Sequence, residues 1–154
     1  MNLMIVVSAD LQAASQMAEA LKTLQQQKTL LLHDAAVSIR QADGSNRMWV
    51  CQELVGNGRL GGMFWGVLFA LIYWSRFWGL NIGSIVDDYG IDDEFIKDVS
   101  QKMTKEHSAL SLLAADEALD PITNALNAFD AQVFTYALSQ AAEDKLNAIF
   151  ASEQ

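Results

Sequence analysis

Apolar residues in the first half of the chain recur at the spacings expected for a βαβ unit. Leu3 to Ser8 is rich in β-branched residues and predicts a buried strand. Asp10 can cap a following helix, in which apolar residues spaced by three and four from Leu11 to Leu24 form one buried face. A second strand is expected at residues 31–40, where Ala35, Val37 and Ile39 alternate with Asp34, Ala36 and Ser38.

This second strand should continue into a hairpin. Ala42 to Ser45 has the composition of a turn. Arg47 to Glu53 then predicts a third strand, paired with the second.

The second half has a similar order of elements. Asp92, Asp93 and Glu94 open an amphipathic helix that ends near Lys105, because acidic side chains are favoured at a helix N-terminus. A strand should follow at residues 108–114. The inward side of the helix is expected to carry Phe95, Ile96, Val99 and Met103.

Asp120 and Pro121 mark the start of a further helix, since proline is well tolerated at the first helical position. A strand at residues 132–138 and a helix at residues 140–150 complete the chain. The inner face of the first helix should be Ile122, Ala125, Leu126 and Phe129, and the last helix should dock through Leu146, Ile149 and Phe150.

Strand, helix and strand therefore occur twice, which predicts an α+β fold of the ferredoxin-like, split βαβ type. The 154 residues fit a single domain. Residues 54–105 are then an insertion between the two units, consisting of a glycine-rich apolar helical hairpin and the helix capped by acidic residues.

The apolar part of this insertion is the most unusual stretch of the sequence. Leu60 to Ser75 carries no charge, and its 16 residues fall just short of the roughly 17 to 25 that a membrane-spanning helix needs. Arg76 breaks the run, and Phe77 to Val86 forms a second, shorter arm. The two arms are expected to form an antiparallel helical hairpin.

Small residues recur every four positions in both arms. They are Gly58, Gly62, Gly66 and Ala70 in the first arm, and Gly79 and Gly83 in the second. On a helix this spacing forms a groove without side chains, which suits close contact between backbones.

The opposite face of the first arm is strongly apolar, with Phe64, Trp65, Leu68, Phe69 and Ile72. Such a surface requires a cover, which we expect to be lipid or a second copy of the chain. Trp74 and Trp78 flank Arg76, a composition that suits either a membrane interface or a protein interface. The simpler alternative is that both helices fill the core. Several glycines in register argue against it, because each costs about 1 kcal/mol relative to alanine.

Charge and cysteine content narrow the function classes. With 19 acidic and 10 basic residues the net charge is -9, which disfavours binding to nucleic acids. The single cysteine, Cys51, fits a reducing compartment, and packing is its expected role. The short apolar run at the N-terminus does not match a signal peptide. These features predict a cytoplasmic protein or one on the cytoplasmic side of the inner membrane.

Candidate chemistry is sparse, and we expect no enzyme activity, metal or cofactor. The acids from Asp87 to Glu94 lack the spacing of a calcium loop and are better explained by helix capping. His33 and His107 stand apart from any nucleophile in the sequence. Residues 56–61 match the glycine spacing of a dinucleotide fingerprint, but no acidic residue follows about 20 positions later.

Two stretches together resemble a known bacterial family. Gly58 to Gly66, a glycine-tryptophan-glycine segment, and Asp88 to Lys97, with the sequence DYGIDDEFIK, are similar to a family of membrane proteins with a domain of unknown function, some of them labelled stress-induced. The similarity extends from Met4 to about Ala137. The resemblance implies no enzyme activity.

Two functional hypotheses follow. The first is a non-enzymatic protein that associates with membrane lipid or with itself as a homo-oligomer, through the glycine-zipper hairpin. The alternative is a soluble ferredoxin-like module that binds a small ligand or regulates a partner and is dimeric through the hairpin.

Overall fold

The computed structural model describes residues 1–27, 30–56, 58–78 and 90–150, and for residues 74–78 it describes the backbone alone. The strands of these residues form one antiparallel sheet of five, in the order β3-β2-β4-β1-β5. The strands are β1 (Asn2–Ser8), β2 (Leu32–Arg40), β3 (Asn46–Val50), β4 (His107–Ala114) and β5 (Gln132–Ala137). β1 lies between β4 and β5, and β4 lies between β1 and β2.

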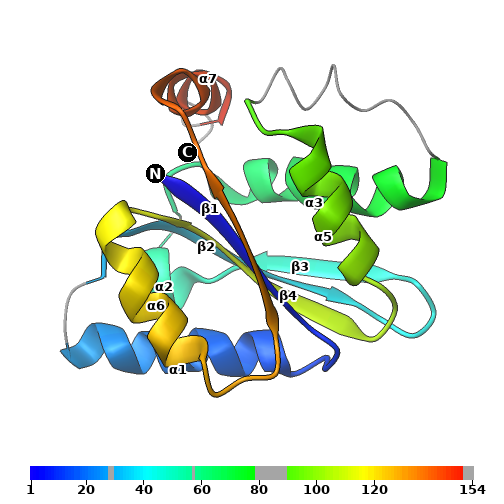
Figure 1. Cartoon of the computed structure of the whole chain (residues 1–154), viewed down its shortest axis with the longest axis horizontal. Coiled ribbons are helices and arrows are strands. Elements are labelled where there is room, and N and C mark those ends of the chain that lie inside the picture. Colours follow the sequence, from blue (N-terminus) through cyan, green and yellow to red (C-terminus); the bar gives the residue numbers. More distant parts are fainter. Residues whose placement is uncertain (28–29, 57, 79–89, 151–154) are drawn as a thin grey trace.

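Helices cover both faces of this sheet (Figure 1). One layer contains α1 (Ala13–Gln27), the short α2 (Gln52–Val55) and α6 (Leu119–Leu126), which is preceded by a 3₁₀ turn at Asp116–Ala118. The other layer contains α3 (Gly61–Trp78), α5 (Asp93–Lys102) and α7 (Gln140–Phe150). Because side chains of a strand alternate between the faces, the central strands are buried on both sides and build two separate cores.

The repeated order of strand and helix is confirmed, and so are most of the inward faces. Ala14, Met17 and Leu21 of α1 are buried, as are Phe95, Ile96 and Val99 of α5. The hairpin of β2 and β3 also forms as expected. The predicted mixed composition of helices and strands is therefore observed.

Several boundaries differ from the prediction. β3 ends at Val50 because the backbone turns at Cys51 into α2, so Gln52 and Glu53 are helical. α6 begins at Leu119, since the preceding 3₁₀ turn continues into it, and Pro121 is not its first residue. In α7, Ile149 is 41% exposed, whereas Leu146 and Phe150 dock the helix.

The apolar insertion departs most from expectation. α3 runs without interruption from Gly61 to Trp78, so Arg76 does not break it. Residues 79–89, which include Gly79 and Gly83 of the expected second arm, lie outside the described residues. Within the described part of the chain, no helix combines the length and apolar character needed to cross a membrane.

Candidate functional site

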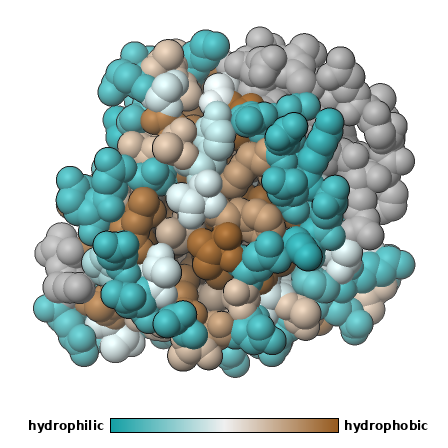
Figure 2. Space-filling model, in the orientation of Figure 1, coloured by the Kyte–Doolittle hydropathy of each residue, from teal (hydrophilic) through white to brown (hydrophobic). Residues whose placement is uncertain are grey.

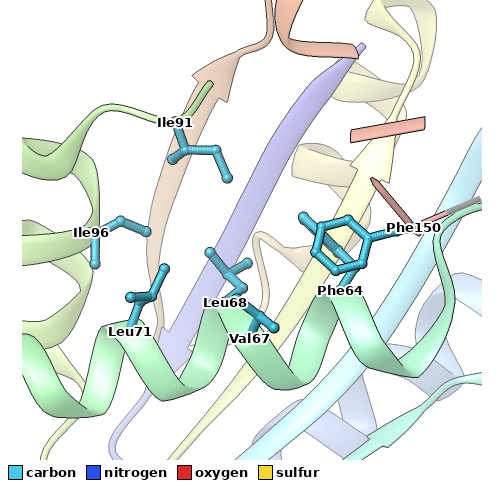
Figure 3. Close-up of a pocket in the computed structure, with 7 residues that line it drawn as sticks. All are labelled: Phe64, Val67, Leu68, Leu71, Ile91, Ile96 and Phe150. Atoms are coloured by element: carbon cyan, nitrogen blue, oxygen red, sulfur yellow. The ribbon is translucent and has the colours of Figure 1, made fainter. Parts of the chain in front are cut away.

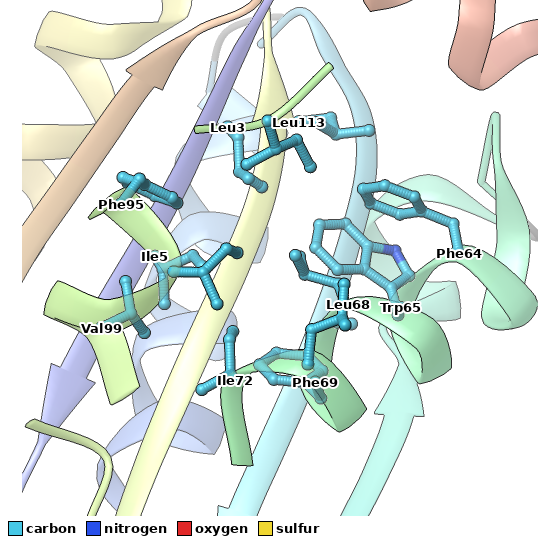
Figure 4. Packing of buried hydrophobic residues seen from close by; sticks show 14 of the residues in the cluster. Leu3, Ile5, Phe64, Trp65, Leu68, Phe69, Ile72, Phe95, Val99 and Leu113 are labelled. Atoms are coloured by element: carbon cyan, nitrogen blue, oxygen red, sulfur yellow. The ribbon is translucent and has the colours of Figure 1, made fainter. Parts of the chain in front are cut away.

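Helix α3 lies on the sheet with its aromatic face inward. Trp65 and Ile72 are completely buried, and Phe64, Leu68 and Phe69 are almost so. Figure 4 shows these side chains against Leu3 and Ile5 of β1, Leu113 of β4, and Phe95 and Val99 of α5.

The burial of this face corrects the sequence analysis. Phe64, Trp65, Phe69 and Ile72 were expected to form an exposed surface that lipid or a second copy would cover. The sheet, α5 and α7 of the same chain cover it instead. The pattern of the sequence could not show this, because the apolar stripe of a core helix has the same period as that of an interface helix.

A buried carboxylate holds the N-terminal end of α3. Asp34 of β2 is fully buried, and its Oδ2 accepts hydrogen bonds from the backbone N–H groups of Leu60 at 2.7 Å and Gly61 at 3.2 Å. Its Oδ1 accepts the indole N–H of Trp65 at 2.8 Å and the N–H of Ala35 at 3.1 Å. The negative charge thus lies where the helix dipole is positive, and it satisfies N–H groups that have no partner inside the helix.

A β-bulge explains how Asp34 reaches α3. Leu32 is paired with Ala114 and Asp34 with Leu113, so His33 is an extra residue in β2. In a regular strand that includes His33, Leu32 and Asp34 would share one face of the sheet, because strand side chains have a period of two. The bulge directs Leu32 towards α1 and Asp34 towards α3.

Gly58 belongs to this capping arrangement and not to a helical groove. It lies in the loop before α3, with φ of +75°. A Cβ at Gly58 would be 2.2 Å from Oδ1 of Asp34, closer than real contacts allow. The predicted role of Gly58 as part of a glycine zipper is therefore wrong, since its lack of a side chain makes room for the carboxylate.

The hydrogen bonds of Asp34 to the start of α3, which we call the Asp34 anchor, also account for the glycine spacing of residues 56–61. In a dinucleotide-binding loop this spacing places a phosphate at the helix N-terminus. Here the Asp34 carboxylate occupies that position and accepts the N–H groups of Leu60 and Gly61. A phosphate would meet a buried negative charge at this point.

A second polar contact between β2 and α3 lies nearer the C-terminal end of both elements. The hydroxyl groups of Ser38 on β2 and Tyr73 on α3 are hydrogen-bonded. The guanidinium of the buried Arg40 lies 5.3 Å from the centre of the Tyr73 ring and donates to the carbonyl oxygen of Met103. Burial is the main cause that raises the pKa of Tyr73, so it remains a neutral phenol at neutral pH.

The side of α3 that faces away from the core carries small residues and is largely exposed. Gly62 and Gly66 are exposed, Met63 between them is 57% exposed, and Ala70 is half-buried. A Cβ at Gly62 would find its nearest atom in Val50 at 3.8 Å, and one at Gly66 would find its nearest in Met48 at 3.9 Å. These are ordinary contact distances, so the fold of the chain would accept alanine at both positions.

The remaining candidates are placed as follows. Trp74 lies in α3 and Trp78 ends it, with side chains outside the described part. Asp92 caps α5 as predicted, because its side chain accepts the N–H of Glu94 at 3.1 Å.

Cys51 is buried among apolar residues of the α1 layer. This burial is the main reason that its pKa is raised to about 12. Asp87 and Asp88 are not described.

The space between α3, α5 and α7 is too small for a ligand larger than a water molecule. A cavity of about 10 Å³ remains there, whereas drug-sized ligand pockets measure roughly 300 to 1,000 Å³. Figure 3 shows its apolar lining by Phe64, Val67, Leu68, Leu71, Ile91, Ile96 and Phe150.

His33, the bulge residue, provides a test by pH. Partial burial first, and the nearby charge of Arg59 second, lower its pKa below the ordinary value of 6.5. As the pH falls, His33 is therefore protonated in the unfolded chain before it is protonated in the folded chain. The free energy of unfolding should decrease as the pH falls through 6.5 and below. We expect the urea midpoint of the wild type to fall more between pH 7.5 and 5.5 than that of His33→Gln. Equal falls would contradict this origin of the pH dependence.

Asp34 is the residue that sequence reasoning missed. In the predicted strand it alternates with Ala35, Val37 and Ile39, and nothing local distinguishes it from a solvent-facing side chain. The available signal was that Asp34 is the single acidic residue of the strand predicted at residues 31–40.

Comparison with known protein families gives one match. The family described as protein of unknown function (DUF1269) matches residues 59–151, which is more than half of the chain. The chain therefore belongs to this family. No curated protein and no solved structure matches it at the threshold applied.

Proposed function

We propose that this member of the DUF1269 family is a non-enzymatic protein that associates with itself through the outward side of α3. The observation that carries the proposal is the presence of two helical glycines for which the fold of the single chain gives no reason. Gly62 and Gly66 have no positive φ, and a Cβ would fit at each. Gly66 lies in the helix interior, where glycine costs about 1 kcal/mol relative to alanine.

Other glycines of the described residues have an evident reason within the chain. Gly58 makes room for Asp34, and Gly90 makes room for α7, where its Cβ would lie 2.5 Å from that of Ala142. Gly44, Gly56 and Gly61 have positive φ values, which favour glycine. Gly62 and Gly66 are thus best explained by close approach of a backbone from outside the chain.

A second copy of α3 is the occupant that fits this surface. Residues 60–75 are uncharged, so two chains that each carry a net charge of -9 can meet there without direct repulsion. A stripe of glycines is also self-complementary, because each groove admits the ridge of the same helix in the other copy. Met63, exposed beside the stripe, adds a flexible apolar contact.

We infer further that the body supporting α3 is of the ferredoxin-like, split βαβ type. Without β3, the strand order is β2-β4-β1-β5, in which α1 connects β1 to β2 and α6 connects β4 to β5. Each helix thus connects two strands that are separated by one other strand of the sheet, as in that motif. α3 and α5 belong to the segment between the two units.

Substitution of Gly66 tests the proposed contact. Gly66→Ala should stabilise the isolated chain by about 1 kcal/mol, because the space is open and the helix gains an alanine. Gly66→Leu should keep the fold but lower the assembly mass measured by light scattering, because a branched side chain blocks the approach of a second backbone.

The matched control is Thr123→Leu, on the exposed side of α6. It adds leucine to a different helix and should leave the assembly mass unchanged. A Gly66→Leu protein with the wild-type mass would refute the contact. If the wild type is a monomer that floats with liposomes and Gly66→Leu does not, the stripe contacts lipid instead.

A further inference from the structure

The outer edge of β5 is a second surface without a partner among the described residues. β5 pairs with β1 on one side, and no described strand pairs with it on the other. Its side chains are exposed or half-buried throughout, and Val133 is 43% exposed. In Figure 2, pale and brown residues form a strip down the middle of this face, where β5 runs in Figure 1, with hydrophilic residues on both sides.

β5 lacks the features that usually protect an edge strand from pairing. Its sequence, QVFTYA, contains no charge, proline or glycine, and its register with β1 is regular. Natural edge strands are commonly interrupted by charged residues, proline or bulges. The opposite edge strand, β3, carries the exposed Arg47 and passes directly into α2. The two edges thus differ in a way that favours pairing at β5.

The backbone groups that β5 offers can be identified from its register. The N–H of Leu138 donates to the carbonyl of Met1, its direct neighbour one step beyond the Asn2–Ala137 pair. Because bonded and non-bonded pairs alternate in an antiparallel ladder, Tyr136 and Phe134 also bond to β1. The N–H and C=O groups of Val133, Thr135 and Ala137 therefore point away from the sheet.

We propose that β5 pairs antiparallel with β5 of a second copy, about a two-fold axis at Thr135. This arrangement joins two five-stranded sheets. Thr135 lies opposite Thr135 of the second copy, Val133 opposite Ala137, and Phe134 opposite Tyr136. The threonine pair and the aromatic pair are of kinds that stabilise neighbouring strands, and no charged residues face each other within the paired segment.

This contact is independent of the one on α3. Each is isologous, because the same surface is used on both copies. A chain with two isologous contacts forms a tetramer or a larger assembly, and loss of either contact leaves a dimer. The two proposals can therefore fail separately.

Charge reversal at Thr135 tests both the surface and the register. Thr135→Lys and Thr135→Glu should each lower the assembly mass in analytical ultracentrifugation, because like charges then face each other. An equimolar mixture of the two variants should recover the wild-type mass. Thr123→Lys and Thr123→Glu, on the exposed side of α6, are the matched controls and should not change the mass.

A covalent probe gives a second measurement if a charged variant does not fold. Opposite residues of a bonded antiparallel pair have Cα atoms about 5.5 Å apart, within reach of a disulfide. Thr135→Cys should thus form a disulfide-linked dimer on mild oxidation, whereas Thr123→Cys should not. The native Cys51 does not compete, because it is buried.

The outcomes separate the two surfaces. A wild-type mass for both charged variants of Thr135, with no cross-link through Thr135→Cys, would overturn the pairing of β5 and leave the α3 contact intact. If Thr135→Lys becomes a monomer while Gly66→Leu keeps the wild-type mass, β5 is the contact and the proposed role of α3 fails. A monomeric wild type without cross-linking would overturn both.

Discussion

Replacing Asp34 by alanine is expected to destabilise the protein by about 3 kcal/mol or more. The change leaves the N–H groups of Leu60 and Gly61 and the indole N–H of Trp65 without an acceptor in a buried place. Each unsatisfied buried donor costs roughly 1 to 3 kcal/mol, and the loss of a charged acceptor lies at the upper end of that range. Urea unfolding followed by circular dichroism measures the effect.

Two further variants separate the parts of this anchor. Asp34→Asn keeps the shape but turns an amide NH₂ towards donors, so it should also be destabilising. Trp65→Phe keeps a large ring and removes only one of the donors, so it should cost less than Asp34→Ala. An Asp34→Ala protein as stable as the wild type would show that the carboxylate does not hold α3.

Gly58→Ala is expected to have the second largest effect. The added methyl group would overlap the Asp34 carboxylate, with 2.2 Å between Cβ and Oδ1, and φ at this residue is +75°. A left-handed conformation costs a residue with a side chain about 1 to 2 kcal/mol, and the overlap adds to this. We expect a total loss of at least about 2 kcal/mol in the free energy of unfolding.

Gly56→Ala is a comparison variant in which the added methyl group meets no other atom. Its φ is also positive, at +62°, but its ψ is -129°, so its loss is conformational alone and belongs to a different backbone conformation. In the double variant with Asp34→Ala, the cost of Gly58→Ala should fall, because the overlapping group is gone. A cost of Gly58→Ala that is the same with and without Asp34→Ala would contradict the close contact with Asp34.

The sequence predicted local elements better than their mutual arrangement. β1, α1 and α7 follow from short-range patterns, and Asp92 caps α5 because a cap needs only residues close in sequence. α3 was correctly identified as apolar and helical. Its continuity past Arg76 was missed, because one charge within a helix does not interrupt the backbone hydrogen bonds that form it.

The inward face of α3 shows why burial was harder to predict. Trp65 and Phe69 give the same apolar stripe whether the sheet of the same chain or another molecule covers them. That choice depends on which face of the sheet is still open once α1 and α6 have packed. It is a property of topology, since α3 packs on β2 and β3 and also against α5 and α7, which follow it in the chain.

The anchor could not be predicted for a related reason. Asp34 and Trp65 are 31 residues apart, and their contact depends on a bulge that has no clear signature in a single sequence. Gly58 shares this property. Its requirement for glycine comes from a carboxylate on another strand, so its spacing from Gly62 and Gly66 suggested a common role that it does not have.

The bulge in β2 determines which single-residue deletions would keep Asp34 on the face of the sheet that α3 covers. A regular strand alternates faces at every residue, so the loss of the single residue His33 would make Leu32 and Asp34 consecutive residues, which still point to opposite faces, as they do with the bulge. The loss of Ala35, in the regular part of the strand, would instead put Asp34 and Ala36 on opposite faces and turn the carboxylate towards the apolar layer of α1 and α6. The two deletions therefore differ in kind, because only the one at Ala35 moves a charge through the sheet without replacing any amino acid.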